Sequence, residues 1–227
     1  MPRHADPNAK DALVAAARAE FAKKGLRGAR IEDITSACGL SKGAFYLHYP
    51  SKEALFGELV TAFATVTQEA TSGRKDLLQQ FLEQHGPVTS KDVQQKSERY
   101  QKLLELEIAQ DLALLEHLWA YRDVVGVLVR GSQGTSFEGF IWTMTDGEVD
   151  RVQEDFTRFQ GGACRSDIPI EMVASLIVGT YLLLAMRMSR ISEKPDLAEW
   201  ARGLHTLIRE GSAPVEDMKP AKPRSLN

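Results

Sequence analysis

Two serine–lysine pairs, Ser41-Lys42 and Ser51-Lys52, stand ten residues apart near the start of the sequence. Serine is a preferred helix cap, so each pair predicts a helix whose first turn carries a lysine. A cation at that place opposes the helix dipole unless an anion lies nearby. Because a helix N-terminus that carries a lysine can bind phosphate, the two pairs predict contacts with a nucleic-acid backbone.

Residues 31–56 contain both pairs and predict two short helices, at about 32–38 and 42–49, and the start of a third after Pro50. Gly39 supplies the left-handed backbone of a tight turn between the first two helices. Two helices joined by so short a turn are typical of helix-turn-helix DNA-binding domains, whose second helix enters the major groove.

The second of these helices has an apolar face and a small, polar face. At about 100° per residue, Phe45 and Tyr49 fall on the side that is expected to pack into the small domain. Gly43 and Ala44 keep the opposite side low enough to approach the floor of a groove about 12 Å wide. Leu47 lies on that outer side, where it could touch a thymine methyl group.

The polar side chains of the segment are assigned by what they can reach. Tyr46, His48 and Lys52 are expected to reach phosphates, and Lys42 a phosphate or a guanine edge. Any one of these residues alone would be read as part of an ordinary solvated helix. Their combination with the turn at Gly39 and the two serine-lysine helix starts favours DNA binding.

Charge is unevenly distributed along the 227 residues, whose net charge is −3. Residues 1–52 hold nine Lys/Arg against five Asp/Glu, a net charge of +4, and residues 53–227 hold 19 against 26, a net charge of −7. The small overall charge excludes a nonspecific polycation. A basic end on an acidic body is typical of a protein that presents one end to nucleic acid.

Residues 8–56 resemble the DNA-binding domain of the TetR family of bacterial regulators. The resemblance implies a homodimer that binds a double-stranded operator, with its last two helices forming the dimer interface and an inducer pocket in its body. Repression, released by a small-molecule effector, is also implied. The positions that match the family signature are Ile31, Ile34, Ala37, Gly39, Leu40, Ser41, Gly43, Phe45, Tyr46, His48, Tyr49, Lys52, Glu53 and Leu55.

The chain departs from the family pattern at three places. Ala29-Arg30 replaces the hydroxyl residue that usually precedes the second helix, which predicts a missing cap and a phosphate contact through Arg30. Thr35 stands where alanine is common, and Ala44 replaces a frequent hydrogen-bonding residue, which favours reading of DNA through shape and methyl contacts. The candidate DNA-binding residues are Arg30, Ser41, Lys42, Gly43, Ala44, Tyr46, Leu47, His48 and Lys52.

Hydrophobic periodicity predicts helix along nearly the whole chain. We expect an all-α fold with an N-terminal three-helix helix-turn-helix domain at 1–52, then an antiparallel helical ligand-binding and dimerisation domain at 53–210. Residues 211–227, with three prolines, are expected to form a disordered tail. The helix that follows Ser51 is expected to end at Thr71-Ser72-Gly73. Further helices are expected at about 75–85, 91–122, 123–130, 135–160, 168–191 and 196–210.

The run Met172–Met186 is apolar on almost every face, which requires burial all round. It could be the central helix of a monomer, but the few contacts of a single helix-turn-helix favour a symmetric dimer. We therefore expect a homodimer through the helices at about 168–191 and 196–210. The run is shorter than the roughly 20 residues that span a bilayer, and no secretory leader is visible, so we expect a cytoplasmic protein without a membrane partner.

Aromatic and methionine side chains are frequent in residues 100–186, where most are expected to be plain core. The pocket that the resemblance implies would be largely apolar with a few polar groups. Aromatic density near the expected helix breaks indicates four candidate pocket residues. These are Trp119, Phe140, Trp142 and Tyr181.

Motifs typical of an enzyme or a metal site were not found, so we expect no catalytic residue, no cofactor and no metal. The five histidines are scattered along the chain. Cys38 is expected to be a small core residue, and Cys164, beside Arg165, is either a redox-sensitive thiol or an inert loop cysteine.

Two other classes of protein stay open. A helical ligand-binding or enzymatic protein could carry a vestigial DNA-binding module, although the serine-lysine helix starts argue against it. An architectural DNA-binding protein would need no ligand, although the acidic, aromatic-rich body argues against that.

Overall fold

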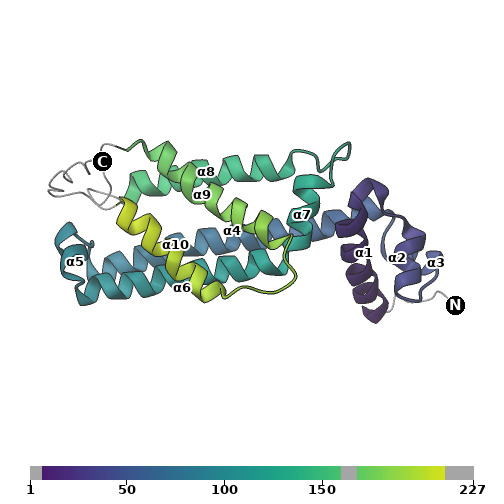
Figure 1. Ribbon diagram of the computed structural model, residues 1–227, viewed down its shortest axis with the longest axis horizontal. Helices are drawn as coiled ribbons and strands as arrows, with labels where there is room; N and C mark the ends of the chain where they lie inside the picture. The colour runs from purple at the N-terminus through teal and green to yellow at the C-terminus, as the bar shows by residue number, and fades with distance from the viewer. Residues whose placement is uncertain (1–6, 160–167, 213–227) are drawn as a thin grey trace, which may run out of the picture.

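The computed structural model describes residues 7–159 and 168–212 of the chain. Within these ranges every regular element is a helix, as expected for an all-α fold. Three helices form a bundle at one end of an elongated molecule, and the others form a body (Figure 1). The bundle contains α1 (Pro7–Gly28), α2 (Ile31–Ala37) and α3 (Lys42–His48). The body contains α4 (Lys52–His85), α5 (Ser90–Gln95), α6 (Glu98–Ala120), α7 (Arg122–Arg130), α8 (Phe140–Phe159), α9 (Ile170–Met188) and α10 (Leu197–Ser212).

Helix α4 is longer than its sequence predicts. The expected end at Thr71-Ser72-Gly73 is wrong, because α4 runs for 34 residues from Lys52 to His85 and is followed by Gly86, where φ is 72°. A glycine inside a helix costs only about 1 kcal/mol, and burial of Phe81 beyond it offsets that cost. Since α4 begins at Lys52, one continuous helix crosses the domain boundary expected at 52/53 and joins the bundle to the body.

The single helix expected at 91–122 is two helices. Lys96 adopts a left-handed conformation, with φ 48°, and separates α5 from α6. Sequence periodicity runs through this position unchanged, so the break could not be read from it.

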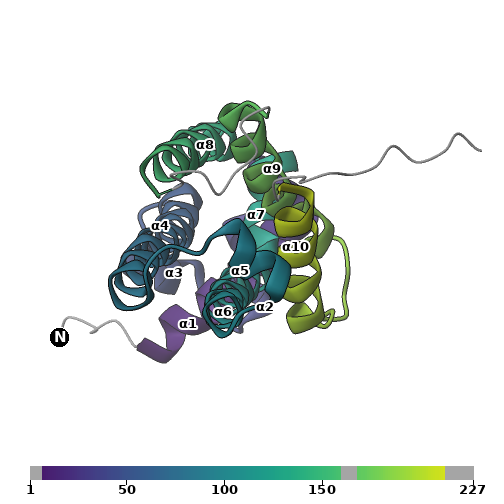
Figure 2. The same cartoon turned by 90° about the vertical axis from the view of Figure 1, so that its left-hand side faces the viewer.

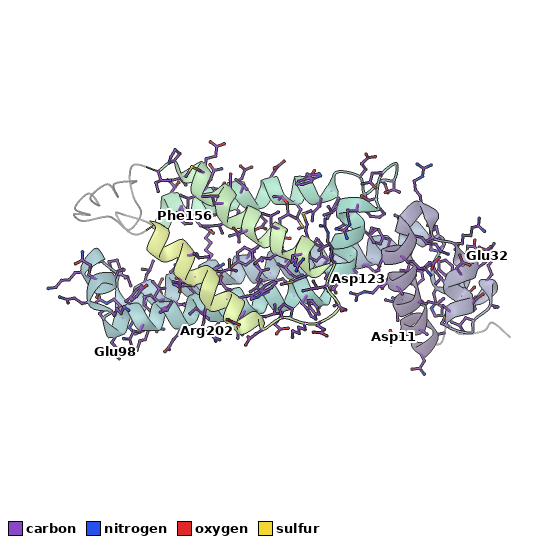
Figure 3. The ribbon with its side chains drawn as sticks, in the orientation of Figure 1. Asp11, Glu32, Glu98, Asp123, Phe156 and Arg202 are labelled. Atoms are coloured by element: carbon purple, nitrogen blue, oxygen red, sulfur yellow. The ribbon has the colours of Figure 1, made fainter. Side chains whose placement is uncertain are left out.

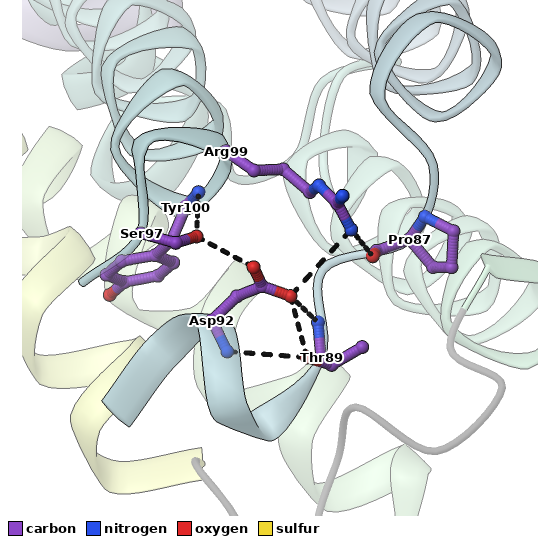
Figure 4. Close-up of polar contacts among 6 residues, drawn as sticks. All are labelled: Pro87, Thr89, Asp92, Ser97, Arg99 and Tyr100. Atoms are coloured by element: carbon purple, nitrogen blue, oxygen red, sulfur yellow. Dashed lines mark hydrogen bonds and ion pairs between the residues drawn. The ribbon is translucent and has the colours of Figure 1, made fainter. Parts of the chain in front are cut away.

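Polar side chains at the start of α5 close the connection between α4 and α6 (Figure 4). Thr89 and Asp92 form a reciprocal capping box, in which the Thr89 amide donates to Asp92 Oδ2 at 2.9 Å. Ser97 Oγ donates to Asp92 Oδ1 at 2.7 Å and also accepts from the Tyr100 amide, which caps α6. Hydrogen bonds from the Thr89 hydroxyl, the Thr89 amide and the Ser97 hydroxyl lower the pKa of Asp92 to about 2, because they favour the ionised carboxylate.

One continuous hydrophobic core runs from the bundle into the body, from Leu13 of α1 to Leu204 of α10. Viewed end on, α8 lies beside α9 and α6 beside α10 (Figure 2). Helix α8 begins at Phe140 rather than at 135, after an irregular segment that follows α7. Helix α10 extends to Ser212, so the first two residues of the expected tail are helical, and 213–227 lie outside the described residues.

Helix α9 is not buried all round within one chain. Leu176 and Leu183 are 61% and 67% exposed, and Met172 of the same helix and Leu207 of α10 are also exposed. With 19 residues, α9 extends beyond the apolar run Met172–Met186 and is long and apolar enough to cross a membrane by length and composition alone, a test that buried core helices also pass. An exposed stripe at this spacing, bordered by the buried Val173 and Ala185, equally fits a helix that packs against a partner.

Candidate functional site

Helix α3 presents the face that the sequence predicts. Phe45 and Tyr49 are buried beneath it, and their rings lie 5.9 Å apart. Ser41 caps the helix by accepting from the Ala44 amide at 3.2 Å. The aromatic side chains therefore anchor α3 to α1 and α2 and fix the direction of its outer face.

The outer face of α3 is free of large side chains near its start. Gly43 is exposed and Ala44 is partly exposed, while Tyr46 and Leu47 are both exposed and His48 partly so. These orientations agree with the sequence prediction. The contacts of these residues with DNA stay a prediction.

The first lysine after a serine cap, Lys42, already has an anionic partner. Its Nζ lies 2.5 Å from Glu32 Oε1 of α2, and both side chains are exposed. This hydrogen bond raises the pKa of Lys42. An exposed pair of this kind adds little stability, so a phosphate can replace Glu32 at small cost.

The second lysine, Lys52, has a structural role that the sequence does not indicate. Its Nζ donates to Arg27 O at 3.0 Å and to Ala29 O at 2.8 Å, and its side chain is mostly buried. Two of its three N–H groups therefore hold the α1–α2 connection against α4, which leaves one for a phosphate. Ser51 caps α4 by accepting from the Ala54 amide at 3.0 Å, as predicted.

Arg30 precedes α2 as its N-cap and makes no side-chain cap hydrogen bond, so the predicted missing cap is confirmed. Its side chain is exposed beside the first turn of α2. Glu32 and Asp33 of that turn complement the helix dipole in place of the cap.

The bundle is joined to the body through α1 and α7. Arg18 donates from Nε to Asp123 Oδ2 at 2.7 Å and from Nη2 to Asp123 Oδ1 at 2.5 Å. Figure 3 shows Asp123 where the body meets the bundle, with Glu32 on the far side of the bundle. This charge-assisted hydrogen bond raises the pKa of Arg18.

The α1–α7 junction also includes a close contact between two backbones. The Leu26 amide donates to Gly131 O at 2.9 Å, and a Cβ on Gly131 would lie 3.0 Å from Gly25 Cα. Gly25 itself has φ 69°, which breaks the helical geometry of α1 at this point. No sequence motif pairs these glycines, because they lie on helices that meet only in the folded chain.

A cavity of about 90 Å³ lies in the body between α4, α6, α7, α8 and α9. Its wall is mostly apolar, with Phe63, Leu114 and Ile141 among the lining residues. Two polar residues of the wall, Arg74 and Tyr181, share the buried Asp111 as partner: Arg74 pairs with its carboxylate, and Tyr181 Oη donates to Asp111 Oδ1 at 2.6 Å. Tyr181 is thus the one candidate pocket residue that lines this cavity.

The ionisable groups around this cavity neutralise one another. Burial opposes the charge of Arg74, but the adjacent Asp111 carboxylate raises the pKa of the guanidinium above its usual range. Burial and the same carboxylate raise the pKa of Tyr181, so the phenol stays protonated. On α8, Arg151 donates to Glu148 Oε2 at 2.9 Å and to Asp155 Oδ2 at 2.9 Å.

The other three candidate pocket residues lie elsewhere. Trp119 packs under the guanidinium of Arg122, which lies 4.0 Å from its ring centroid. Phe140 begins α8, and Trp142 on the outer face of α8 is 54% exposed. Aromatic density did not locate the cavity, because most of its lining is aliphatic and comes from five separate helices.

His117 links the cavity to the junction. Its Nε2 lies 3.1 Å from Phe63 O and 3.1 Å from Thr67 Oγ1, and burial lowers its pKa. Its ring stacks on Phe63 with centroids 5.4 Å apart, and the Tyr121 ring follows at 4.9 Å. Since Arg18 lies over the Tyr121 ring, a continuous set of contacts runs from the cavity wall to α1.

Among the described residues there is no cluster of three or more side chains that could hold a metal ion. Cys38 is partly buried behind the turn at Gly39, and its thiol donates to Ile34 O at 3.4 Å. Cys164 lies outside the described residues.

Comparison with protein families identifies the N-terminal helices. Residues 13–59 match the profile described as bacterial regulatory proteins of the tetR family. The HTH-type transcriptional regulator YerO of Bacillus subtilis (strain 168) is 66% identical over 35 residues, which are 15% of this chain and 12% of YerO. The HTH-type transcriptional repressor DhaR of Mycobacterium sp. (strain GP1) is 38% identical over 52 residues, which are 23% of this chain and 26% of DhaR. The similarity thus spans far less than two thirds of these relatives.

Solved structures extend the likeness of fold to the body. The ketosteroid transcriptional regulator KstR2 of Mycobacterium tuberculosis aligns with a TM-score of 0.67 at 18% identity, over 91% of this chain and 95% of KstR2. The fatty acid degradation regulator FadR of Bacillus halodurans aligns with a TM-score of 0.58 at 17% identity, over 92% of this chain and 98% of FadR. The N-terminal helices thus match the profile of the tetR family, and the described chain as a whole shares its fold with these two regulators.

Proposed function

We propose that this protein is a transcriptional repressor that binds its operator through α3 and leaves it when a small molecule enters the body. The observation that carries the proposal is the outer face of α3, small at Gly43 and Ala44 and fixed from below by Phe45 and Tyr49. Such a face can reach base edges in a major groove, while Arg30, Lys42 and His48 reach the flanking phosphates.

A salt-dependent binding assay with genomic DNA fragments tests this proposal. Binding should weaken with salt, and Arg30→Ala should reduce the slope by about 0.9, the value of one phosphate contact, without changing sequence preference. Leu47→Ala should instead change which fragments are retained. Lys91→Ala, on α5 at the opposite end of the molecule, is the control and should leave both properties unchanged. A protein that retains no double-stranded fragment at low salt would contradict the proposal.

The functional unit in this proposal is a homodimer. The exposed stripe of Met172, Leu176 and Leu183 on α9, with Leu207 on α10, supports pairing with the same helices of a second copy. A dimer would also cover the apolar surface of α9 in water, in line with a cytoplasmic protein. It would place two copies of α3 to meet half-sites about 34–36 Å apart.

The cavity would accept an uncharged and mainly apolar effector. Its guanidinium groups are already paired with Asp111 and Glu148, so an anionic ligand gains no free cation and loses its own hydration. Thr71 lines the same wall and offers a hydroxyl for one ligand hydrogen bond.

Two probes of matched size test the effector class. Isothermal titration should give measurable binding of benzyl alcohol and at least about tenfold weaker binding of benzoate, because only the latter buries a charge. Ile177→Trp should fill the cavity and abolish binding of benzyl alcohol. Val66→Trp, on the exposed side of α4, is the control. Preferential binding of benzoate would exclude a neutral-ligand site.

Release from DNA would follow from the contacts that leave the cavity wall. A ligand that displaces Phe63 or Thr67 disturbs His117, and through Tyr121 it shifts Arg18 on α1. A differential affinity of about 1–3 kcal/mol between the two arrangements is enough for such coupling.

A further inference from the structure

A second hollow lies outside the body cavity, in the cleft between α1 and α7. Two open lobes of about 430 and 480 Å³ meet there and share Ala22, Gly126 and Arg130 in their walls. One wall belongs to the DNA-binding bundle and the other to the body. Helices α1 and α2 lie between α7 and α3 (Figure 1), so the cleft lies apart from α3, although Lys52, another candidate DNA-binding residue, donates to the backbone oxygen of Arg27.

The cleft carries an excess of positive charge. Its walls contain six cationic side chains and a single carboxylate, that of Asp123, which is occupied by Arg18. Lys24 is paired outside the cleft with Glu20 and Asp33. The cations without a carboxylate partner in the described structure are Lys23, Arg27, Arg122 and Arg130.

Helix dipoles explain only part of this excess. The helical turns of α1 and of α7 end at the cleft, and each C-terminus contributes about −0.5 of an elementary charge. Arg122 lines only one of the two lobes, and its guanidinium stacks on Trp119. Against about −1 from the two helix ends, Lys23, Arg27 and Arg130 leave a surplus of about two positive charges.

Two of these cations are positioned by glycines. A Cβ on Gly134 would lie 2.8 Å from Arg27 Nη1, and a Cβ on Gly126 would lie 3.2 Å from Arg130 Nη2. Arg130 is held further by a hydrogen bond from Nη2 to Ser189 Oγ at 3.0 Å. Absence of side chains at 126 and 134 therefore lets one guanidinium from each part of the molecule lie against the backbone of the body.

We propose that the α1–α7 cleft binds a small phosphoryl-bearing anion that bridges the bundle and the body. Two guanidiniums and an ammonium offer donors to three or more oxygens, which a phosphoryl group has and a single carboxylate lacks. The anion neutralises the surplus charge and ties α1 to α7. It acts at a place distinct from the cavity that the proposed effector enters.

Inorganic pyrophosphate at constant ionic strength is the probe, measured by isothermal titration on the full chain without DNA. We expect one site per chain, and a dissociation constant raised about tenfold or more in the Arg27→Gln/Arg130→Gln double variant. Lys23→Gln, a single exposed change, should raise it several-fold. Lys91→Gln removes the same charge at α5 and should bind as the parent does. Lys42→Gln removes it at the DNA surface and reports any pyrophosphate that is bound there instead of in the cleft.

Three results would overturn the proposal. Equal binding by the parent and by both cleft variants would show that the cleft holds no anion. If Lys42→Gln lost as much affinity for pyrophosphate as the double variant, the anion would be assigned to the DNA surface. An equal loss in Lys91→Gln would show that binding depends only on the net charge of the protein. Circular dichroism of the variants shows whether they fold, and Lys23→Gln keeps the test valid if the double variant does not. Because no DNA is present, the outcome is independent of the proposed repressor function.

Discussion

Lys42 and Lys52 follow serine caps in the same way, yet their ammonium groups meet different surroundings. Lys42 is exposed and paired with Glu32, whereas Lys52 donates to two backbone carbonyls and is mostly buried. The inward positions of Phe45 and Tyr49 were predictable, because helical period alone decides the faces of a seven-residue helix. The partners of Lys52 were not, because Arg27 lies 25 residues earlier and no local pattern reports so distant a contact.

Substitution by methionine should separate the two lysines. Lys52→Met removes a charged donor from two carbonyls and should lower the free energy of unfolding by about 1–3 kcal/mol. Lys42→Met breaks only an exposed ion pair and should change it by less than about 1 kcal/mol. Urea denaturation measures both, and equal losses in the two variants would contradict the assignment of Lys52.

The Asp92 carboxylate should make the stability of the α4–α6 connection depend on pH. Its folded pKa of about 2 is lower than the value of about 4 in an unfolded chain, so its stabilisation is complete above about pH 5. It is lost as the pH falls from about 4 to about 2. Asp92→Asn should therefore be less stable than the parent at pH 6, and the difference should shrink toward pH 2. Asp146→Asn, an exposed change on α8, is the control in the same denaturation series.

At the scale of helices, glycine positions and apolar periodicity differed in how well they predicted where each helix begins and ends. Gly86 ends α4 as expected, because its backbone is left-handed, whereas Gly73 does not, because burial of Phe81 extends the packed face beyond it. Most helix ranges followed from apolar spacing, but the break at Lys96 did not, since a lysine gives no turn signal. The cavity was missed for a related reason: its wall is assembled from five helices, and no one of them carries a recognisable pattern.

The joint between α1 and α7 is predicted to depend strongly on one ion pair. Arg18 and Asp123 form two hydrogen bonds, and both side chains are mostly shielded from water. A double-mutant cycle with Arg18→Gln and Asp123→Asn should give a coupling energy of about 1–3 kcal/mol in unfolding experiments. The exposed Lys10–Glu58 pair, also between helices, should give less than about 1 kcal/mol in the same cycle. Similar coupling energies for the two pairs would remove the special role of Arg18.

At the scale of the whole molecule, the exposed leucines of α9 are expected to lie at the dimer interface. Leu176→Glu with Leu183→Glu places charges where apolar contact is expected and should raise the dimer dissociation constant more than about 100-fold. Sedimentation equilibrium measures this change. Trp142→Glu is a control, because Trp142 is also more than half exposed but lies on α8. A dimer that survives the double substitution and dissociates with Trp142→Glu would place the interface on α8.

The uninterrupted course of α4 gives the molecule a rigid lever. From Thr67 at the cavity to Lys52 the helix rises about 22 Å at 1.5 Å per residue. If α4 pivots as a stiff rod near the cavity, a tilt of about 5° displaces its far end by about 2 Å. If α4 tilts in opposite directions in the two subunits of a dimer, the distance between their α3 helices changes by about 4 Å, roughly one base-pair step of 3.4 Å. A small movement of α4 at the cavity would thereby take both α3 helices out of register with the grooves of the duplex.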